Sequence, residues 1–184
     1  IFGTLATVAT FVVFYLMTVF SLSWATTDLG FTRRDFLILQ LLSVVFFGIA
    51  IPISALLADK FGRRTVLMVI SGAIALFGLT FALLLGSGNT TLVSLFLIVG
   101  MTLMGLTYGP MGTFLSELFP TEVRYSGASL TFNFAGIIGA AFAPMIAIWL
   151  AKNYGIDFVG YYLSVAAVIS FVSLLVITKK EHKF

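Results

Sequence analysis

The residues that could carry out chemistry are few in this chain. The sequence has ten Lys and Arg, seven Asp and Glu, one His and no Cys. The lack of Cys excludes disulfides and thiolate metal sites, and the single histidine, His182, lies in a charged tail with Lys180 and Lys183, where we expect water to surround it. The apolar segments contain no paired acids, metal-ligand cluster or histidine base that an enzyme would need. We therefore expect neither catalysis nor a cofactor.

Four side chains inside apolar segments can offer hydrogen bonds or an aromatic face: Tyr15, Gln40, Tyr108 and Asn133. In such surroundings a polar group either contacts a ligand or bonds to a neighbouring helix. The sequence leaves both roles open for all four, and the case for a ligand contact is weakest for Tyr15. No Lys or Arg lies deep in an apolar segment. We predict that the four form a neutral surface that binds a small molecule, with Asn133 turned inward.

Five charged residues border the apolar segments at two short loops: Asp59, Arg63, Arg64, Glu117 and Arg124. Partial removal of water strengthens the attraction between opposite charges. We therefore predict an ion-pair network that holds one side of the molecule closed and breaks when that side opens. The alternative is that these charges only fix the orientation of the chain, and it applies more to Glu117 and Arg124 than to Asp59.

The elements that position these residues are long apolar runs. The chain is 60% hydrophobic and 9% charged, against about 25% charged residues in a soluble domain, and its mean hydropathy is +1.15. Each run reaches the ~20 residues with which a helix crosses about 30 Å of hydrocarbon, whereas strands of a membrane barrel would be about half as long. We predict an all-α membrane protein with six spans, at about 1–24, 36–57, 65–86, 92–116, 127–151 and 158–178.

The cationic residues are divided unequally between the two sides of this predicted bundle. Seven lie on one side and three on the other; the seven are Lys60, Arg63, Arg64, Arg124, Lys179, Lys180 and Lys183, and the three are Arg33, Arg34 and Lys152. The excess of positive charge in cytoplasmic loops places the group of seven in the cytoplasm. Six spans then put both ends of the chain there. The net charge of +3 reflects this bias, and no basic run indicates a nucleic-acid surface.

Small residues predict close helix packing in the fourth span. Gly105 and Gly109 are four residues apart, a spacing that lets two helix backbones approach each other. Gly109 followed by Pro110 also predicts a break within the membrane. Irregular backbone at that depth must face protein or a water-filled cavity, so we expect this break to point away from lipid.

One charged segment and its counterpart resemble a known family. Residues 55–65 read Ala-Leu-Leu-Ala-Asp-Lys-Phe-Gly-Arg-Arg-Thr, and this order resembles the cytoplasmic signature loop of the major facilitator superfamily of transporters, with Ala55 where glycine is usual. The loop from Glu117 to Arg124 is similar to the one between the tenth and eleventh spans of these transporters. Residues 108–129 and the first span resemble the metabolite:proton symporter branch, which includes shikimate, 2-oxoglutarate, citrate and proline/betaine carriers.

The resemblance implies the C-terminal six-span half of a twelve-span transporter, a 3+3 inverted repeat whose N-terminal half is absent from this sequence. Spans one and four would line the pathway, two and five would meet the other half, and three and six would face lipid. It implies proton-coupled symport of a small organic acid or zwitterion by alternating access in a bacterial inner membrane. The cation that pairs with the substrate and the acid that carries the proton would both come from the other half. The chain begins at Ile1 without an initiator Met, which we interpret as a fragment.

A stand-alone six-span channel is the alternative from another functional class. A channel needs a selectivity device, such as a re-entrant loop lined by carbonyls or a ring of charge. Neither is visible in the sequence, which favours the transporter. Six further spans with a second signature loop upstream would decide between the two.

Overall fold

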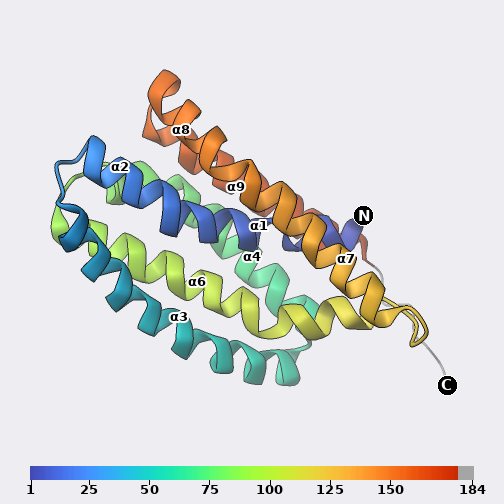
Figure 1. Cartoon of the computed structure of the whole chain (residues 1–184). Helices are drawn as coiled ribbons and strands as arrows, with labels where there is room; N and C mark the ends of the chain where they lie inside the picture. The colour runs from blue at the N-terminus through green and yellow to red at the C-terminus, as the bar shows by residue number, and fades with distance from the viewer. Residues whose placement is uncertain (178–184) are drawn as a thin grey trace.

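The computed structural model describes residues 1–177, and these residues form helices with no strand (Figure 1). The predicted all-α fold is confirmed. The elements are α1 Phe2–Tyr15, η1 Leu16–Phe20, α2 Ser21–Thr27, α3 Arg33–Phe61, α4 Arg63–Leu79, α5 Phe81–Leu84, α6 Thr90–Glu117, α7 Arg124–Gly136, η2 Ile137–Ala141, α8 Ala143–Tyr154 and α9 Ile156–Val176. The two η elements are single π-helical turns inside longer helices.

Five helical segments are long and apolar enough to cross a membrane. They are Phe2–Thr27, Arg33–Phe61, Thr90–Glu117, Arg124–Tyr154 and Ile156–Val176. The third expected segment, 65–86, folds as α4 and α5 with an interruption at Thr80. The 17 residues of α4 span only about 25 Å at 1.5 Å per residue. The count of six spans therefore stays a prediction.

Glycine makes two of the sharp helix-to-helix junctions. Gly62 (φ +86°) follows the last residue of α3 and precedes the first of α4, and Gly155 (φ +98°) stands in the same way between α8 and α9. Only glycine adopts such a positive φ without strain.

We call the end of the bundle that holds Gly62 and the loop 118–123 the motif end, and the end that holds Gly155 the far end. The N-terminus lies at the motif end (Figure 1).

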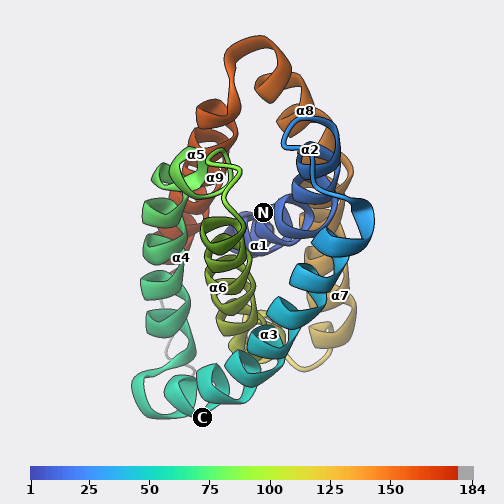
Figure 2. The same cartoon turned by 90° about the vertical axis from the view of Figure 1, so that its left-hand side faces the viewer.

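The helices form a central group with two flanks. In Figure 1, α3 lies along one edge, α7 and α8 lie along the other, and α6 and α1 run between them, with α4 and α9 behind. Figure 2 shows α4 and α9 on the side of the bundle away from α3, α7 and α8. The most apolar stretch of Phe2–Thr27 is 61% buried, against 22% for Arg33–Phe61 and 28% for Arg124–Tyr154. The first segment is therefore the core of the bundle, and the two flanking segments expose most of their surface.

The close packing predicted from Gly105 and Gly109 is confirmed. A Cβ atom at Gly105 would lie 2.5 Å from the carbonyl oxygen of Phe47, and one at Gly109 would lie 2.6 Å from that of Ile51, both on α3. The predicted break at Gly109-Pro110 is wrong, because α6 continues through Pro110 to Glu117. Proline removes one backbone donor, and a membrane helix packed this closely against a neighbour tolerates that loss.

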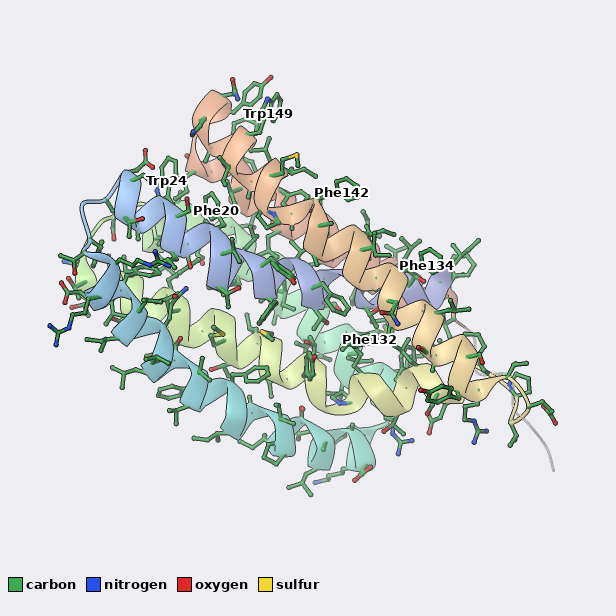
Figure 3. All side chains as sticks on the ribbon, viewed as in Figure 1. Phe20, Trp24, Phe132, Phe134, Phe142 and Trp149 are labelled. Carbon is green, nitrogen blue, oxygen red and sulfur yellow. The ribbon has the colours of Figure 1, made fainter. Side chains whose placement is uncertain are left out.

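Two sets of aromatic side chains distinguish the buried side of the helices from the outer surface of the bundle. Phe20 and Trp24 stack with their ring centroids 6.0 Å apart, and the buried indole Nε1–H of Trp24 has no hydrogen-bond partner within the described residues. On span five, Phe134, Phe142 and Trp149 follow the outer edge of the bundle (Figure 3) and are each more than half exposed. This edge of the bundle therefore presents apolar rings outward.

Candidate functional site

Three of the five predicted gate residues meet at the motif end. Asp59 lies in the last turn of α3, Arg63 is the first residue of α4, and Glu117 is the last of α6. The Arg63 Nη2 atom is 3.7 Å from Asp59 Oδ1, and Arg63 Nη1 pairs with Glu117 Oε1. One guanidinium therefore links three helices. The Arg63 side chain is 33% exposed, but those of Asp59 and Glu117 are 70% and 53% exposed, so water screens both pairs.

The other two predicted gate residues make different contacts. The Arg64 Nε atom donates to the carbonyl oxygen of Leu174 (2.6 Å) and its Nη2 atom to that of Leu175 (2.8 Å), at the end of α9. Consecutive residues of a helix point about 100° apart, so Arg63 and Arg64 cannot both face α6. Arg124 Nε is 3.5 Å from the Phe119 carbonyl oxygen within its own loop. The structure thus joins three of the five residues, and the gate function of this network stays a prediction.

Gln40 lies where span one changes its helical register. Its Nε2 atom donates to the carbonyl oxygens of Met17 (2.8 Å) and Thr18 (2.9 Å) and lies 3.4 Å from Ser21 Oγ. Met17 and Thr18 belong to η1, where the π turn displaces the regular pattern of helix hydrogen bonds. The buried Gln40 amide therefore serves as an interhelical donor, one of the two roles that the sequence left open. Its Oε1 atom accepts no hydrogen bond from residues 1–177.

The two predicted tyrosines keep their hydroxyl groups free of hydrogen bonds to the described residues. Tyr15 is partly buried at the end of α1 and lies edge-on to Phe14, with 5.0 Å between ring centroids. Tyr108 on α6 is 40% exposed and lies edge-on to Phe47 of α3, with 5.8 Å between centroids. Both hydroxyls can therefore bond to a ligand or to another part of the protein.

Asn133 does not turn into the bundle as predicted. It is exposed, and its Nδ2 atom donates to the Ser129 carbonyl oxygen of its own turn (2.8 Å). Since the side chain is satisfied within α7, the helix needs no inward-facing partner for it. Asn133 instead lines a cavity of about 570 Å³ between α6 and α7 near the motif end, together with Ser116, Arg124 and Tyr125.

A second cavity, of about 310 Å³, lies near the far end and contains none of the four predicted contacts. Its lining residues are Thr18, Val19, Leu22, Ser23, Thr26 and Arg33. From sequence, Arg33 was assigned only to the orientation of the chain. The signal that could have indicated this cavity is the number of hydroxyl residues in span one, where Thr18, Ser23 and Thr26 follow each other within nine positions.

No group of three or more His, Asp or Glu that could hold a metal ion occurs in the part of the chain that the structure describes. His182 and the three lysines of the tail lie outside the described residues. What the described residues offer is an ion-paired junction of three helices, two cavities that open beside polar side chains, and a core of neutral helices.

Comparison with known proteins shows to which family this chain belongs. The sequence model of the Major Facilitator Superfamily matches residues 2–184. The chain belongs to that superfamily. This membership confirms the family resemblance drawn from the sequence.

Several curated relatives of this superfamily member are named as transport proteins and none of them as an enzyme. The inner membrane metabolite transport protein YhjE of Escherichia coli K12 is 47% identical over 100% of this chain and 43% of its own length. The proline/betaine transporter of Salmonella typhimurium is 30% identical over 90% of this chain and 33% of its own. The citrate-proton symporter of Klebsiella pneumoniae is 30% identical over 90% of this chain and 38% of its own length. The chain thus spans less than half the length of these relatives, and no solved structure gives a significant match.

Proposed function

We propose that this superfamily member is the C-terminal six-span half of a secondary active transporter that works by alternating access. The observation that carries the proposal is the superfamily match over residues 2–184, in a chain whose closely similar relatives are named metabolite transport proteins. Alternating access requires two halves that rock around a central site. The motif end, which holds Arg63 and Arg124, would face the cytoplasm of a bacterial cell. The helices α4 and α5 together would form the sixth membrane-spanning segment.

The exposed faces of the two flanking segments support the presence of a second half. On α3, Leu41 and Leu56 are 69% and 71% exposed, and α3 is the least buried of the five long segments. Its hydroxyl-poor outer face could also lie against lipid. The family arrangement, in which spans two and five meet the other half, favours the first use, and the chain covers only 43% of its 47% identical relative.

We propose a substrate that carries a carboxylate. Citrate, proline and betaine, which appear in the names of the relatives, all contain this group, although they differ in net charge. Proton coupling is proposed from the symporter relative. Every Asp and Glu among residues 1–177 is exposed, which supports a proton-carrying acid located in the other half.

Tyr15, Gln40, Tyr108 and Asn133 remain our proposed substrate contacts, in different ways. The free hydroxyls of Tyr15 and Tyr108 and the unpaired Gln40 Oε1 can take part in hydrogen bonds without loss of an existing one. Asn133 would have to give up its bond to Ser129 or use its amide oxygen. Tyr108 is the strongest of the four, because it is accessible and its ring is held against α3.

A counterflow assay tests this function. The intact transporter that contains this chain is reconstituted in liposomes loaded with citrate, L-proline or glycine betaine, and uptake of the same labelled compound is measured with and without a pH gradient. We expect counterflow with at least one of the three and stimulation by an acid outside pH. Ion current through the protein, without saturable counterflow, would support the channel instead.

A further inference from the structure

The far-end cavity lies between the outer part of span one and the start of α3. Five of its lining residues, from Thr18 to Thr26, come from η1 and α2, and the sixth, Arg33, is the first residue of α3. Its volume of about 310 Å³ is at the lower end of the range of small-molecule sites, which runs from roughly 300 to 1,000 Å³. A compact metabolite would fit.

Arg33 brings an unpaired positive charge to this cavity. Within residues 1–177 it makes no ion pair and no side-chain hydrogen bond. The two acids nearest to it in sequence are already engaged: Asp28 accepts a hydrogen bond from Thr27, and Asp35 Oδ2 accepts one from the Thr32 hydroxyl at 2.7 Å. The guanidinium is therefore available to an anion, and its planar fork matches the geometry of a carboxylate.

One hydroxyl in the cavity is also available as a donor. Thr18 donates to the Phe14 carbonyl oxygen (2.6 Å), and Thr26 donates to that of Leu22 (2.9 Å), so their hydrogens are used within their own helix. The Ser23 hydroxyl makes no hydrogen bond to the described residues. Val19 and Leu22 supply apolar wall beside it. A cation, a free hydroxyl and an apolar wall together suit a carboxylate on a small aliphatic body.

Gln40 limits the inner side of this region. It follows Arg33 by seven residues, so it lies on the same face of α3 about 10 Å further into the bundle. Its Nε2 atom holds the carbonyl oxygen of Thr18, a lining residue, at 2.9 Å. The wall that carries Thr18 is thereby fixed relative to the helix that carries Arg33.

From this geometry we propose that the far-end cavity is an entry site where Arg33 and Ser23 bind the carboxylate of the substrate before it moves inward. The substrate class rests on the proposed function. The sequence analysis placed the cation that pairs with the substrate in the other half alone. This site adds a second cation, Arg33, at the far end of the present half. Arg34, the next residue, lines neither this cavity nor the one beside Asn133.

Cysteine labelling tests the site without relying on transport. This chain has no Cys, so Val19→Cys is introduced into the intact transporter after removal of any cysteines elsewhere. Val19 lines the cavity and is 44% exposed, and this change leaves both proposed ligand groups, Arg33 and Ser23, in place. Labelling rates are measured in membranes with an anionic and a cationic methanethiosulfonate reagent of similar size. We expect Arg33→Gln to lower the anion-to-cation rate ratio by about threefold or more at low salt, whereas the matched change Arg34→Gln has a smaller effect.

The same cysteine reports binding. Citrate, L-proline and glycine betaine are added in turn, and we expect at least one to slow labelling by the neutral reagent N-ethylmaleimide with Arg33 or Arg33→Lys present, and not with Arg33→Gln. An unchanged rate ratio in Arg33→Gln would overturn the proposal. A changed ratio without protection by any of the three would also overturn it, since Arg33 would then be a solvated charge and no ligand site. Protection without counterflow would leave the site standing and contradict the transport function.

Discussion

At the scale of single residues, Gln40 shows how one side chain can support a helix to which it does not belong. The carbonyl oxygens of Met17 and Thr18 in η1 both accept a hydrogen bond from the Gln40 amide nitrogen. Met17 also accepts one from the Ser21 hydroxyl, so loss of the Gln40 donor weakens one acceptor and leaves the other, partly buried, without its side-chain donor. The cost of a buried polar group that loses its partner is about 1–3 kcal/mol. The sequence indicated that Gln40 was either a ligand contact or an interhelical donor, and only coordinates could show which atoms lie opposite it.

We predict that Gln40→Leu lowers the stability of the bundle by about 1–3 kcal/mol, measured by unfolding of the purified transporter in detergent. Asn153→Leu is the matched control, because its amide donates only to Trp149 within its own helix and the residue is exposed. Equal stability losses in the two variants would contradict the supporting role of Gln40 in η1.

A second prediction concerns Tyr108. Its hydroxyl has no partner within the described residues, so Tyr108→Phe should leave folding intact and raise the half-saturation concentration of transport about three- to tenfold, the loss of one hydrogen bond. The pH dependence should not shift, because we propose that the proton-carrying acid lies in the other half. Tyr161→Phe on α9, where Tyr161 lies edge-on to Phe158, is the control. A shifted pH profile in Tyr108→Phe would show that this half takes part in proton coupling.

At the scale of helices, composition and spacing predicted most of what the structure contains. Long apolar runs gave the helices, and the spacing of Gly105 and Gly109 gave the contact between α6 and α3. The π turns were not predictable, because one extra residue in a helical turn leaves no mark in composition. The interruption at Thr80 and the continuity through Pro110 also depend on tertiary packing, which can override local preference.

The contact of α6 with α3 gives a third prediction. Gly105→Ala places a methyl group against the Phe47 carbonyl oxygen and the Ala50 side chain, so we expect a loss of about 1–3 kcal/mol from overpacking. Gly112→Ala on the same helix meets no atom within 4 Å and should be neutral or slightly stabilising. Thermal unfolding in detergent compares the two. If both variants were equally stable, the backbones of α3 and α6 would be further apart than described here.

At the scale of the whole molecule, Arg63 joins three helices at the motif end through Asp59 and Glu117. The sequence predicted charges of both signs here from the two loops, yet it could not assign partners. Arg63 and Arg64 are chemically alike, and only the direction of each on α4 decides that one reaches α6 and the other the end of α9. Exposed ion pairs contribute at most about 1 kcal/mol to stability, so this junction should matter for movement more than for folding.

We therefore predict that Asp59→Asn cuts the transport rate severely while expression, membrane insertion and unfolding temperature stay close to those of the unmodified protein. Lys60→Gln is the neighbouring control, since Lys60 makes no ion pair in the described part of the chain and lies over the Phe61 ring at 5.2 Å. Uptake at the normal rate in Asp59→Asn, at equal protein amounts, would rule out a gate role for the network.

The stacking of Trp24 on Phe20 also provides an intrinsic fluorescent probe of α2. The chain has two Trp residues, and Trp149 is 54% exposed on the outer edge of span five. With Trp149 replaced by Phe, emission from this chain comes from an indole whose N–H is buried and has no acceptor among residues 1–177, a surrounding that shifts fluorescence to short wavelength. Water or a hydrogen-bond acceptor that reaches this group when α2 moves would shift the emission to the red, so one natural side chain can follow η1 and α2 during the transport cycle that we propose.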